Sequence, residues 1–386
     1  MKLALFFTRG ISLKIWLETG LFDREKLVYE EHLRQGNLKK VYWITYGSGD
    51  KKIAEKLKIE GRLHKDIEIL QMPKAFNSKL GKLLYSFYIP FIYGEVIKKV
   101  DILKTNQMDG SWSAVISKWL YKKPLIIRTG YTASLFARRL SKFRYKYKIY
   151  EFMEKFAYNH CNLAVVASKR DRNYICSKYN IPQDKVFVIY NYIDTKKFRP
   201  IPDIKKYGNR LIYVGRLTKQ KNLFNLVKAI SRLNLTLDIY GSGELEEDLK
   251  KEVKRLRANV NFQGTVSNDK LPIILNRYRY FILPSYFEGM PKSLLEAMAC
   301  GILCIGTNVE GINEVIEDGK TGILACNTDV NSLVKAIKRA FNLERNNYQR
   351  IVHTARSFIE NNFSLQACIE KEKKLFNCFK EKDEHV

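Results

Sequence analysis

The 386-residue sequence has few of the features that mark disulfide-bonded, fibrous or zinc-binding chains. Its seven cysteines are an odd number, are scattered and include no Cys-x-x-Cys pair. That pattern argues against a disulfide framework or a zinc site and indicates a reducing cytosol. With 21 glycines and 9 prolines against 46% hydrophobic residues, the chain is neither fibrous nor disordered. At about 150 residues per domain, this length predicts two or three domains.

Long apolar runs are also missing. The opening residues 1–7 are too short for the core of a signal peptide, and Arg9 prevents the run from extending further. The most apolar later stretch, Tyr85–Tyr93, has about half the length of a bilayer span and contains Pro90. We therefore expect any contact with a membrane to be peripheral.

Acidic residues are scarce in the first half of the chain. The net charge is +28, from 68 Lys and Arg against 40 Asp and Glu. Residues 1–200 hold 39 basic and 18 acidic side chains, and residues 201–386 hold 29 and 22, so +21 of the net charge lies in the first half. Residues 110–150 contain ten basic side chains, no acidic one and nine interleaved aromatics. This distribution predicts a surface that faces a polyanion, either a nucleic acid or an anionic membrane.

Both halves alternate short apolar runs with helical patterns, which is typical of strands buried on both faces of a parallel sheet. The strands predicted in the first half are residues 3–8, 41–45, 67–70, 102–105, 125–128, 163–167 and 186–190. Those predicted in the second half are 210–214, 236–240, 260–263, 280–283, 303–306 and 322–325. The helices predicted in the second half are 222–231, 245–257, 270–276, 292–299, 312–317 and 330–342, with an amphipathic tail helix at 365–382. The fold class is therefore α/β, with two doubly wound sheets.

A polar segment that contains prolines separates the two halves. We predict an N-terminal domain at 1–192, a linker at 193–208, a C-terminal domain at 209–364, and a final helix at 365–386 that packs back toward the N-terminal domain. Ligands of doubly wound sheets bind at the carboxyl ends of the strands. We therefore expect a ligand in a cleft between the two domains.

The most informative segment follows the strand predicted to end at Leu283. Gly289 lets the backbone approach a ligand, and Pro291 suits the first turn of a helix. The amides of residues 293–295 would then be free to bind an anion. Glu288 lies just before this helix and Glu296 two turns into it, so one carboxylate could accept hydrogen bonds from sugar hydroxyls and the other from a ribose diol.

Two cations stand after the strand predicted to end near Gly215. Arg216 and Lys221 lie five residues apart on a loop that opens into a helix. Arginine can bind phosphate oxygens with two parallel hydrogen bonds, and lysine supplies a point charge. Taken alone, this segment is better explained as a solvated basic turn.

A glycine pair after the next strand offers a different interpretation. Gly241 and Gly243 follow a strand and precede a helix, as in a dinucleotide-binding fingerprint. The third glycine of that fingerprint is replaced by Glu246, which would repel a pyrophosphate. A plain strand-to-helix turn is favoured.

Together these segments resemble the retaining glycosyltransferases of family 4, which have the GT-B fold of two Rossmann-like domains facing across a cleft. The resemblance rests on the E-x7-E spacing of Glu288 and Glu296. It extends in the right order over nearly the whole second half, through residues 214–217, 221–222, 241–243, 262–266 and 311–322. These motifs are specific for handling the donor and say little about the acceptor.

The resemblance implies transfer of a sugar from a nucleotide-diphosphate sugar to a lipid-linked or glycan acceptor, with retained anomeric configuration. The first domain would then bind the acceptor and the second the donor, with a UDP-sugar expected and a GDP-sugar as the alternative. Arg216 and Lys221 would neutralise the diphosphate, while Glu288 would hold the donor sugar and Glu296 the ribose. The remaining donor-binding positions that the resemblance implies are Gly215, Gly264, Val266, Gly289, Met290, Pro291, Ser293, Leu294 and Leu295.

The first half departs from the family pattern. Many members carry a histidine after a middle strand of the first domain, but the corresponding stretch here, residues 128–134, has none. The five histidines are His32, His64, His160, His353 and His385, and none fits that role. The usual N-terminal glycine pair is reduced to Gly10, which with Gly130 and Tyr131 forms the set of candidate cleft residues.

The basic, aromatic segment of the first half predicts a membrane-facing patch. Its candidate residues are Arg138, Arg139, Lys142, Arg144, Lys146 and Lys148. Family members of this kind commonly dock that domain on anionic lipid, so we expect a cytoplasmic enzyme at the cytoplasmic face of the cell membrane, with a lipid-linked saccharide as acceptor and a product used in surface polysaccharide or glycolipid synthesis.

Two rival interpretations remain. A nucleic-acid-binding protein is favoured by the pI of 9.6 alone, but the sequence holds no recognisable nucleic-acid motif and no nucleic-acid partner is expected. Another GT-B enzyme, such as a sugar-nucleotide epimerase or a phosphorylase, would not explain the set of Arg216, Lys221, Glu288 and Glu296.

The sequence has no Asp-x-Asp motif, and the GT-B resemblance implies that neither a metal nor another cofactor is required. Catalysis should therefore survive EDTA, because Arg216, Lys221 and helix amides would supply the positive charge for the leaving diphosphate. The check is the transfer rate before and after chelation. Complete loss of activity that magnesium restores would contradict this prediction.

Overall fold

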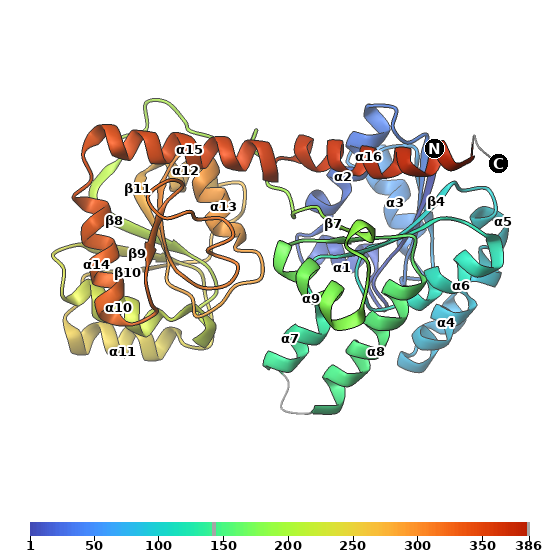
Figure 1. Ribbon diagram of the computed structural model, residues 1–386, viewed down its shortest axis with the longest axis horizontal. Helices are drawn as coiled ribbons and strands as arrows, with labels where there is room; N and C mark the ends of the chain where they lie inside the picture. The colour runs from blue at the N-terminus through green and yellow to red at the C-terminus, as the bar shows by residue number, and fades with distance from the viewer. Residues whose placement is uncertain (141–143, 384–386) are drawn as a thin grey trace. The chain divides into compact units, whose positions relative to one another are not determined.

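The computed structural model describes residues 1–140 and 144–383, except for the side chains of residues 136, 139, 140, 144–146 and 380–383. The chain forms two compact units (Figure 1). Unit 1 comprises Met1–Tyr190 together with the described residues from Cys368 onward, and unit 2 comprises Asn191–Ala367. The tail of the chain therefore belongs to the same unit as its beginning.

Unit 1 is built on a seven-stranded parallel sheet in the order β3-β2-β1-β4-β5-β6-β7. Its strands are β1 (Lys2–Phe6), β2 (Lys40–Ile44), β3 (Ile67–Leu70), β4 (Ile102–Thr105), β5 (Leu125–Thr129), β6 (Leu163–Val166) and β7 (Val186–Val188). In the register, Leu3 of the central β1 lies opposite Val41 of β2 and Ile102 of β4. The winding direction reverses between β1 and β4, so the switch point of this sheet lies there.

Helices flank this sheet and cover its buried strands (Figure 1). They are α1 (Leu13–Glu18), α2 (Phe22–Arg34), α3 (Asp50–Ile59), α4 (Lys79–Ile92), α5 (Gly94–Ile97), α6 (Ser111–Tyr121), α7 (Ala133–Leu140), α8 (Arg144–His160), α9 (Lys169–Tyr179) and α16 (Leu365–Asp383), with 3-10 turns η1 (Lys74–Phe76) and η2 (Gln183–Lys185). The hydroxyls of Ser12, Ser78 and Ser168 accept hydrogen bonds from amides in the first turns of α1, α4 and α9, which satisfies donors that a helix start leaves open.

Unit 2 repeats this plan with six parallel strands in the order β10-β9-β8-β11-β12-β13. These strands are β8 (Tyr207–Val214), β9 (Thr236–Tyr240), β10 (Val260–Gly264), β11 (Tyr278–Leu283), β12 (Leu303–Thr307) and β13 (Ile323–Ala325). The flanking elements are η3 (Lys219–Lys221), α10 (Leu223–Ser231), α11 (Glu246–Leu256), α12 (Leu271–Asn276), α13 (Lys292–Ala299), α14 (Val330–Phe341) and α15 (Arg345–Phe363). The switch point of unit 2 lies between β8 and β11.

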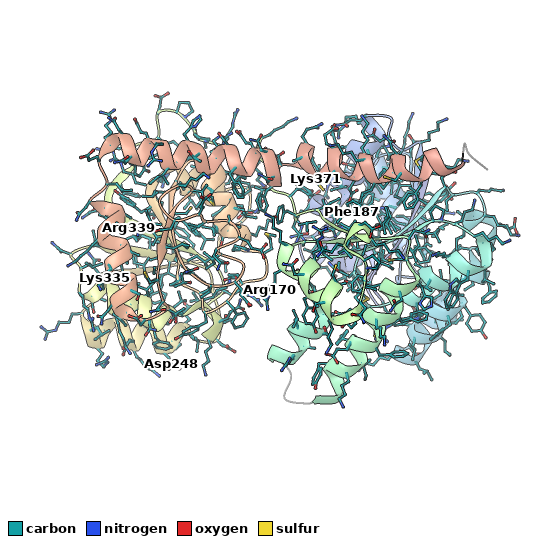
Figure 2. The ribbon with its side chains drawn as sticks, in the orientation of Figure 1. Arg170, Phe187, Asp248, Lys335, Arg339 and Lys371 are labelled. Carbon is teal, nitrogen blue, oxygen red and sulfur yellow. The ribbon has the colours of Figure 1, made fainter. Side chains whose placement is uncertain are left out.

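Several charged side chains of unit 2 lie on its helices α11 and α14. Asp248 is in the first turn of α11, where a negative charge complements the helix dipole, and Lys335 and Arg339 are exposed on α14 (Figure 2). Arg339 pairs with Asp318. In unit 1, Phe187 lies on the edge strand β7 and Lys371 on α16, where its ammonium is 5.4 Å from the Tyr190 ring centre (Figure 2).

All thirteen predicted strands are confirmed, with bounds within two residues except that β8 begins three residues before the predicted start at 210, but the helix predicted at 312–317 is wrong. This segment is a hydrogen-bonded turn. The Thr321 hydroxyl accepts a hydrogen bond from the Glu317 amide and donates one to the Val315 carbonyl. Because Thr321 takes up both backbone groups, neither needs the hydrogen bond that a continuing helix would give it. The 19-residue helix α15 was not anticipated, although its buried residues Ile351, Ala355 and Ile359 follow a four-residue spacing.

A buried charge cluster ties α16 to the rest of unit 1. Glu372 of α16 accepts hydrogen bonds from Lys104 of β4 at 2.6 Å and from His32 of α2 at 3.2 Å, and all three side chains are almost wholly buried. Burial alone would raise the pKa of Glu372, but the Lys104 ammonium and the bond to His32 outweigh it and hold the pKa well below its ordinary value. The interaction joins parts of the chain 268 residues apart.

Substituting Glu372→Gln should lower the free energy of unfolding of unit 1 at pH 7 by about 3–5 kcal/mol, because it leaves Lys104 buried without its counter-charge. Since the folded-state pKa is lowered, the contribution is present above the ordinary glutamate pKa of about 4.3 and is lost as the pH falls toward the folded-state value. The variant should therefore lose less stability between about pH 5 and pH 3 than the parent protein does.

Urea unfolding followed by tryptophan fluorescence makes this measurement selective, because all four tryptophans lie in unit 1. The matched control is Glu95→Gln, which removes an exposed carboxylate 2.7 Å from Lys98 and should change stability little. Equal stability of the two variants would contradict a structural role for the cluster.

Candidate functional site

The predicted donor residues gather at one edge of the unit 2 sheet. The loop with Arg216 and Lys221 follows β8, and the loop with Glu288 follows β11. These are the two central strands, and their carboxyl ends lie on either side of the switch point. Doubly wound sheets leave room for a ligand at such a point, because the neighbouring connections run off in opposite directions.

An ion pair links the two loops. Lys221 Nζ lies 2.6 Å from Glu288 Oε1, and both side chains are largely buried. The Ser285 hydroxyl donates a second hydrogen bond to the same carboxylate oxygen at 2.5 Å. Gln220 Nε2 donates to the Phe287 carbonyl at 2.8 Å and lies 3.5 Å from Glu288 Oε2. The sequence indicated Lys221 and Glu288 as separate contacts for phosphate and sugar, but the structure joins them.

Asn222 fixes the turn that carries Lys221. Its backbone is left-handed, with a φ of 54°, and its buried side-chain amide donates to the carbonyls of Pro284 at 3.0 Å and Thr328 at 2.8 Å. The Tyr286 amide donates to the Gln220 carbonyl, which adds a backbone bond between the same loops. The spacing between Lys221 and Glu288 is therefore set by the backbone as well as by their charges.

Glycines allow the loops after β8 and β9 to pack closely. A Cβ on Gly241 would lie 1.9 Å from the Gly215 carbonyl oxygen, and one on Gly243 would lie 2.4 Å from the Leu217 oxygen. The Gly241-Ser-Gly243 motif is thus explained by backbone contact. The Tyr213 hydroxyl donates to the Arg216 carbonyl at 2.9 Å, and Arg216 is exposed.

Glu296 presents a buried hydrogen-bond acceptor. Its side chain on α13 is 4% exposed, and burial raises the pKa of this carboxyl above its ordinary value, which Lys292 offsets in part. Lys292 Nζ lies 3.4 Å from Oε1, but this oxygen has no hydrogen-bond partner among the described residues. A buried oxygen without a donor is costly, so it suits a ligand hydroxyl.

The expectation of three free amides at the start of α13 is wrong for two of them. The amides of Leu294 and Leu295 both donate to the Pro291 carbonyl, at 3.0 and 3.1 Å. Pro291 is the N-cap, and a residue in that position accepts the first bonds of the helix. In the part of the chain that the structure describes, the Ser293 amide donates no backbone hydrogen bond and is the one that remains for an anion.

The other predicted donor positions lie at the same edge of the sheet. Gly264 ends β10 with a φ of 71°. Its carbonyl accepts a hydrogen bond from the Gly241 amide, so a nucleotide base would have to contact the backbone of the next residues, through Val266. A Cβ on Gly289 would meet no protein atom within 4 Å. Met290 is half-buried between Gly289 and the N-cap.

The candidate residues of unit 1 follow β1 and β5, at the carboxyl edge of that sheet. Gly10 has a φ of 79°. The Gly130 amide donates to Gln107 Oε1 at 2.9 Å, and Tyr131 is 47% exposed. The sequence did not predict an ion pair at the switch point of unit 1, between β1 and β4. In this pair Arg9 Nε donates to Asp109 Oδ1 at 3.0 Å. His160 is the last residue of α8.

The predicted membrane patch falls mostly outside the described side chains. Lys142 is outside the described residues, and the side chains of Arg139, Arg144 and Lys146 are not described. Arg138 on α7 and Lys148 on α8 are exposed. The patch therefore stays a prediction.

Two kinds of feature are absent from the described residues. No described helix is both long enough and apolar enough to cross a bilayer. The described residues also contain no group of three or more His, Cys, Asp or Glu side chains arranged to hold a metal ion.

Comparison with known proteins identifies relatives of both units. The family model "Glycosyltransferase Family 4" matches residues 31–197, and the model "Glycosyl transferases group 1" matches residues 194–358. The chain is 29% identical over 301 residues to an Escherichia coli UDP-Gal:alpha-D-GlcNAc-diphosphoundecaprenol alpha-1,3-galactosyltransferase, covering 72% of this chain and 76% of that protein.

A Campylobacter jejuni alpha-1,4-N-acetyl-D-galactosaminyltransferase, named for an acceptor on PP-undecaprenol, is 26% identical over 76% of this chain and 80% of its own length. Among solved structures, the Anabaena protein Alr3699/HepE in complex with UDP has a TM-score of 0.75 at 15% identity, with 98% and 100% of the two chains covered. At that identity the structural match shows the fold alone.

The two doubly wound sheets and these matches define a GT-B glycosyltransferase. More specifically, the chain belongs to the family 4 glycosyltransferases, whose two family models together span residues 31–358.

Lys221→Ala should lower the transfer rate by roughly a hundred- to a thousandfold, because it would remove a preorganised charge from the place where we expect the leaving diphosphate. Arg216→Ala should behave similarly. The matched control Lys219→Ala changes an exposed lysine of the same turn and should keep wild-type activity, as should Glu246→Ala on α11.

A paired variant separates catalysis from structure. Lys221→Ala also leaves the buried Glu288 carboxylate without its counter-charge, so the protein should lose stability as well as transfer activity. The double variant Lys221→Met/Glu288→Gln replaces both charges by neutral groups and should recover stability in urea without recovering activity. Recovery of activity in the double variant, or more than half of wild-type activity in Lys221→Ala, would contradict the donor assignment.

Proposed function

We propose that this glycosyltransferase moves a hexose-type sugar from a nucleoside diphosphate to a lipid-linked saccharide, with retention of anomeric configuration, in the synthesis of a surface polysaccharide or glycolipid. We also propose that unit 2 binds the donor, that unit 1 binds the acceptor, and that the enzyme works at the cytoplasmic face of a membrane without a metal ion. A UDP-sugar is the first donor to test and a GDP-sugar the second.

One observation carries the donor proposal. Unit 2 has a buried carboxylate oxygen, Glu296 Oε1, that makes no hydrogen bond with the described residues, although the Lys292 ammonium lies 3.4 Å away. It is on the helix that follows the Lys221–Glu288 pair. A ribose hydroxyl would satisfy this oxygen. Lys221, Arg216 and the Ser293 amide would then stabilise the diphosphate, and Glu288 would hold the donor sugar.

The proposed chemistry develops negative charge on the leaving diphosphate and positive charge on the sugar ring. Lys221 and Arg216 supply positive charge for the first, and the Ser293 amide at the positive end of α13 adds to it. The Glu288 carboxylate, held by Ser285 and Lys221, would orient sugar hydroxyls next to the ring.

The relatives support the acceptor proposal. The Escherichia coli and Campylobacter jejuni proteins are both named for acceptors that carry undecaprenol linked through a diphosphate. The net charge of +21 in residues 1–200 suits such an anionic acceptor.

The deciding experiment offers the protein UDP-, GDP- and ADP-sugars and measures slow hydrolysis, then transfer to undecaprenyl-diphosphate saccharides, with the anomeric configuration of the product read by NMR. We expect one donor class to be hydrolysed and its sugar transferred with retention. Inversion, or turnover of none of the nucleotide sugars, would refute the proposal.

The ribose contact has its own test. Wild-type protein should bind UDP about ten- to a hundredfold more tightly than 2′,3′-dideoxy-UDP, the difference expected for hydrogen bonds to a charged group. In Glu296→Gln this preference should shrink to a few-fold, as measured by calorimetric titration. An unchanged preference in Glu296→Gln would show that the ribose lies elsewhere.

A further inference from the structure

Unit 2 has an open cavity at the amino edge of its sheet, at the opposite end of the strands from the candidate donor site. It lies where β8 begins at Tyr207, and its volume of about 700 Å³ is within the range of small-molecule sites. The donor loops follow the carboxyl ends of β8 and β11 instead. At about 3.3 Å per residue, the length of β8 from Tyr207 to Gly215 separates the two places by about 25 Å. We call this space the amino-edge cavity.

Three cations line the amino-edge cavity: Lys205, Lys206 and Arg277. None of the three forms an ion pair in the part of the chain that the structure describes, and Lys206 is half-buried. Burial lowers the pKa of the Lys206 ammonium below its ordinary value, the Cys300 thiol offsets this in part, and the Arg279 guanidinium adds to it. The cavity therefore gathers like charges where water is partly excluded, and their repulsion is uncompensated.

The acidic residues beside these segments do not compensate the cations. Asp203 is exposed, does not line the cavity and makes no ion pair with a described residue. Asp238 of β9 is buried and is bound by Arg210 at 3.2 Å and by the Tyr278 hydroxyl at 2.7 Å. Asp269, before α12, pairs with a lysine outside the cavity. The next cation along β8, Arg210, thus has a counter-charge that the cavity cations lack.

Hydrogen bonds hold the walls of the amino-edge cavity in place. The Tyr207 amide donates to the Arg277 carbonyl at 2.8 Å, which joins the start of β8 to the residue after α12. The buried Asn276 side chain accepts a hydrogen bond from the Ile201 amide at 2.9 Å and donates one to the Arg199 carbonyl at 3.0 Å. The segment that carries the two lysines is therefore attached to α12 and β11, and a cavity with fixed walls loses little conformational freedom when a ligand binds.

Apolar surface lies beside the cations. Ile204, Tyr207 and Ile273 also line the cavity, and Tyr207 and Ile273 are 37% and 49% exposed. A bare inorganic anion would leave this surface in water, whereas a ring that carries a phosphate would cover it. Arginine can bind two phosphate oxygens at once, and lysine adds a point charge.

We propose that the amino-edge cavity binds an organic phosphate, a phosphate group carried on a sugar or nucleotide ring. Lys206 and Arg277 hold the phosphate, and Tyr207 and Ile273 contact the ring. An anion in this place removes the repulsion among the three cations, and a concave space of this size fits a small ligand rather than a membrane or a nucleic acid. The proposal is independent of the donor assignment, because the two places share no residue.

The experiment is calorimetric titration of the whole protein with glucose 1-phosphate, AMP and inorganic phosphate. At least one of the two ring phosphates should bind at least tenfold more tightly than inorganic phosphate. Lys206→Gln/Arg277→Gln should weaken that binding at least tenfold. The matched control Lys254→Gln/Lys335→Gln removes the same charge from exposed positions of α11 and α14 outside the cavity, and it should bind as wild type does.

The same titrations in Lys221→Ala separate this cavity from the candidate donor site. Binding there should equal wild type, and the ring phosphate that binds identifies the ligand as a sugar phosphate, a nucleotide or either. Loss of binding in Lys221→Ala, with binding kept in Lys206→Gln/Arg277→Gln, overturns the proposal by placing the ligand at the donor site. So does inorganic phosphate that binds as tightly as both ring compounds, or no binding of either ring compound.

Thermal unfolding shows whether the cations have a structural role instead. Lys206→Gln/Arg277→Gln removes unpaired like charges, so it should unfold at the same temperature as wild type or a higher one. A clearly lower unfolding temperature would contradict the proposal, because the cations would then be stabilised within the fold.

Discussion

The ion pair between Lys221 and Glu288 is the interaction on which the unit 2 site depends. Parallel strands bring their carboxyl ends to one edge, but only a contact across the switch point fixes the loops after β8 and β11 relative to each other. Burying both charges is costly, and the cost is offset here by the Ser285 hydroxyl and by the backbone bonds around Asn222 and Tyr286. A site held in this way would need little rearrangement to stabilise the diphosphate of the donor that we propose.

Unit 1 uses buried charge for a different purpose. Glu372 brings the last helix onto the strand that carries Lys104, so the end of the chain completes the unit formed by its beginning. The two units divide the work that we propose, with donor binding in unit 2 and acceptor binding in unit 1.

Much of this architecture could be predicted from the sequence because strands buried on both faces must be continuous apolar runs. The spacing of Glu288 and Glu296 also predicted that these two carboxylates, the candidates for donor binding, lie near the start of one helix, since both belong to one short segment. The sequence could not pair Lys221 with Glu288, which are 67 residues apart, or show that the Pro291 carbonyl takes up the amides of Leu294 and Leu295.

We propose that unit 2 binds a nucleoside diphosphate at its switch point, and a crystal structure of the protein with UDP would show whether it does. We expect a diphosphate oxygen within hydrogen-bond distance of Lys221 Nζ and a ribose hydroxyl within that distance of Glu296 Oε1. A nucleotide bound away from both side chains, with the Glu296 oxygen still lacking a donor, would contradict it.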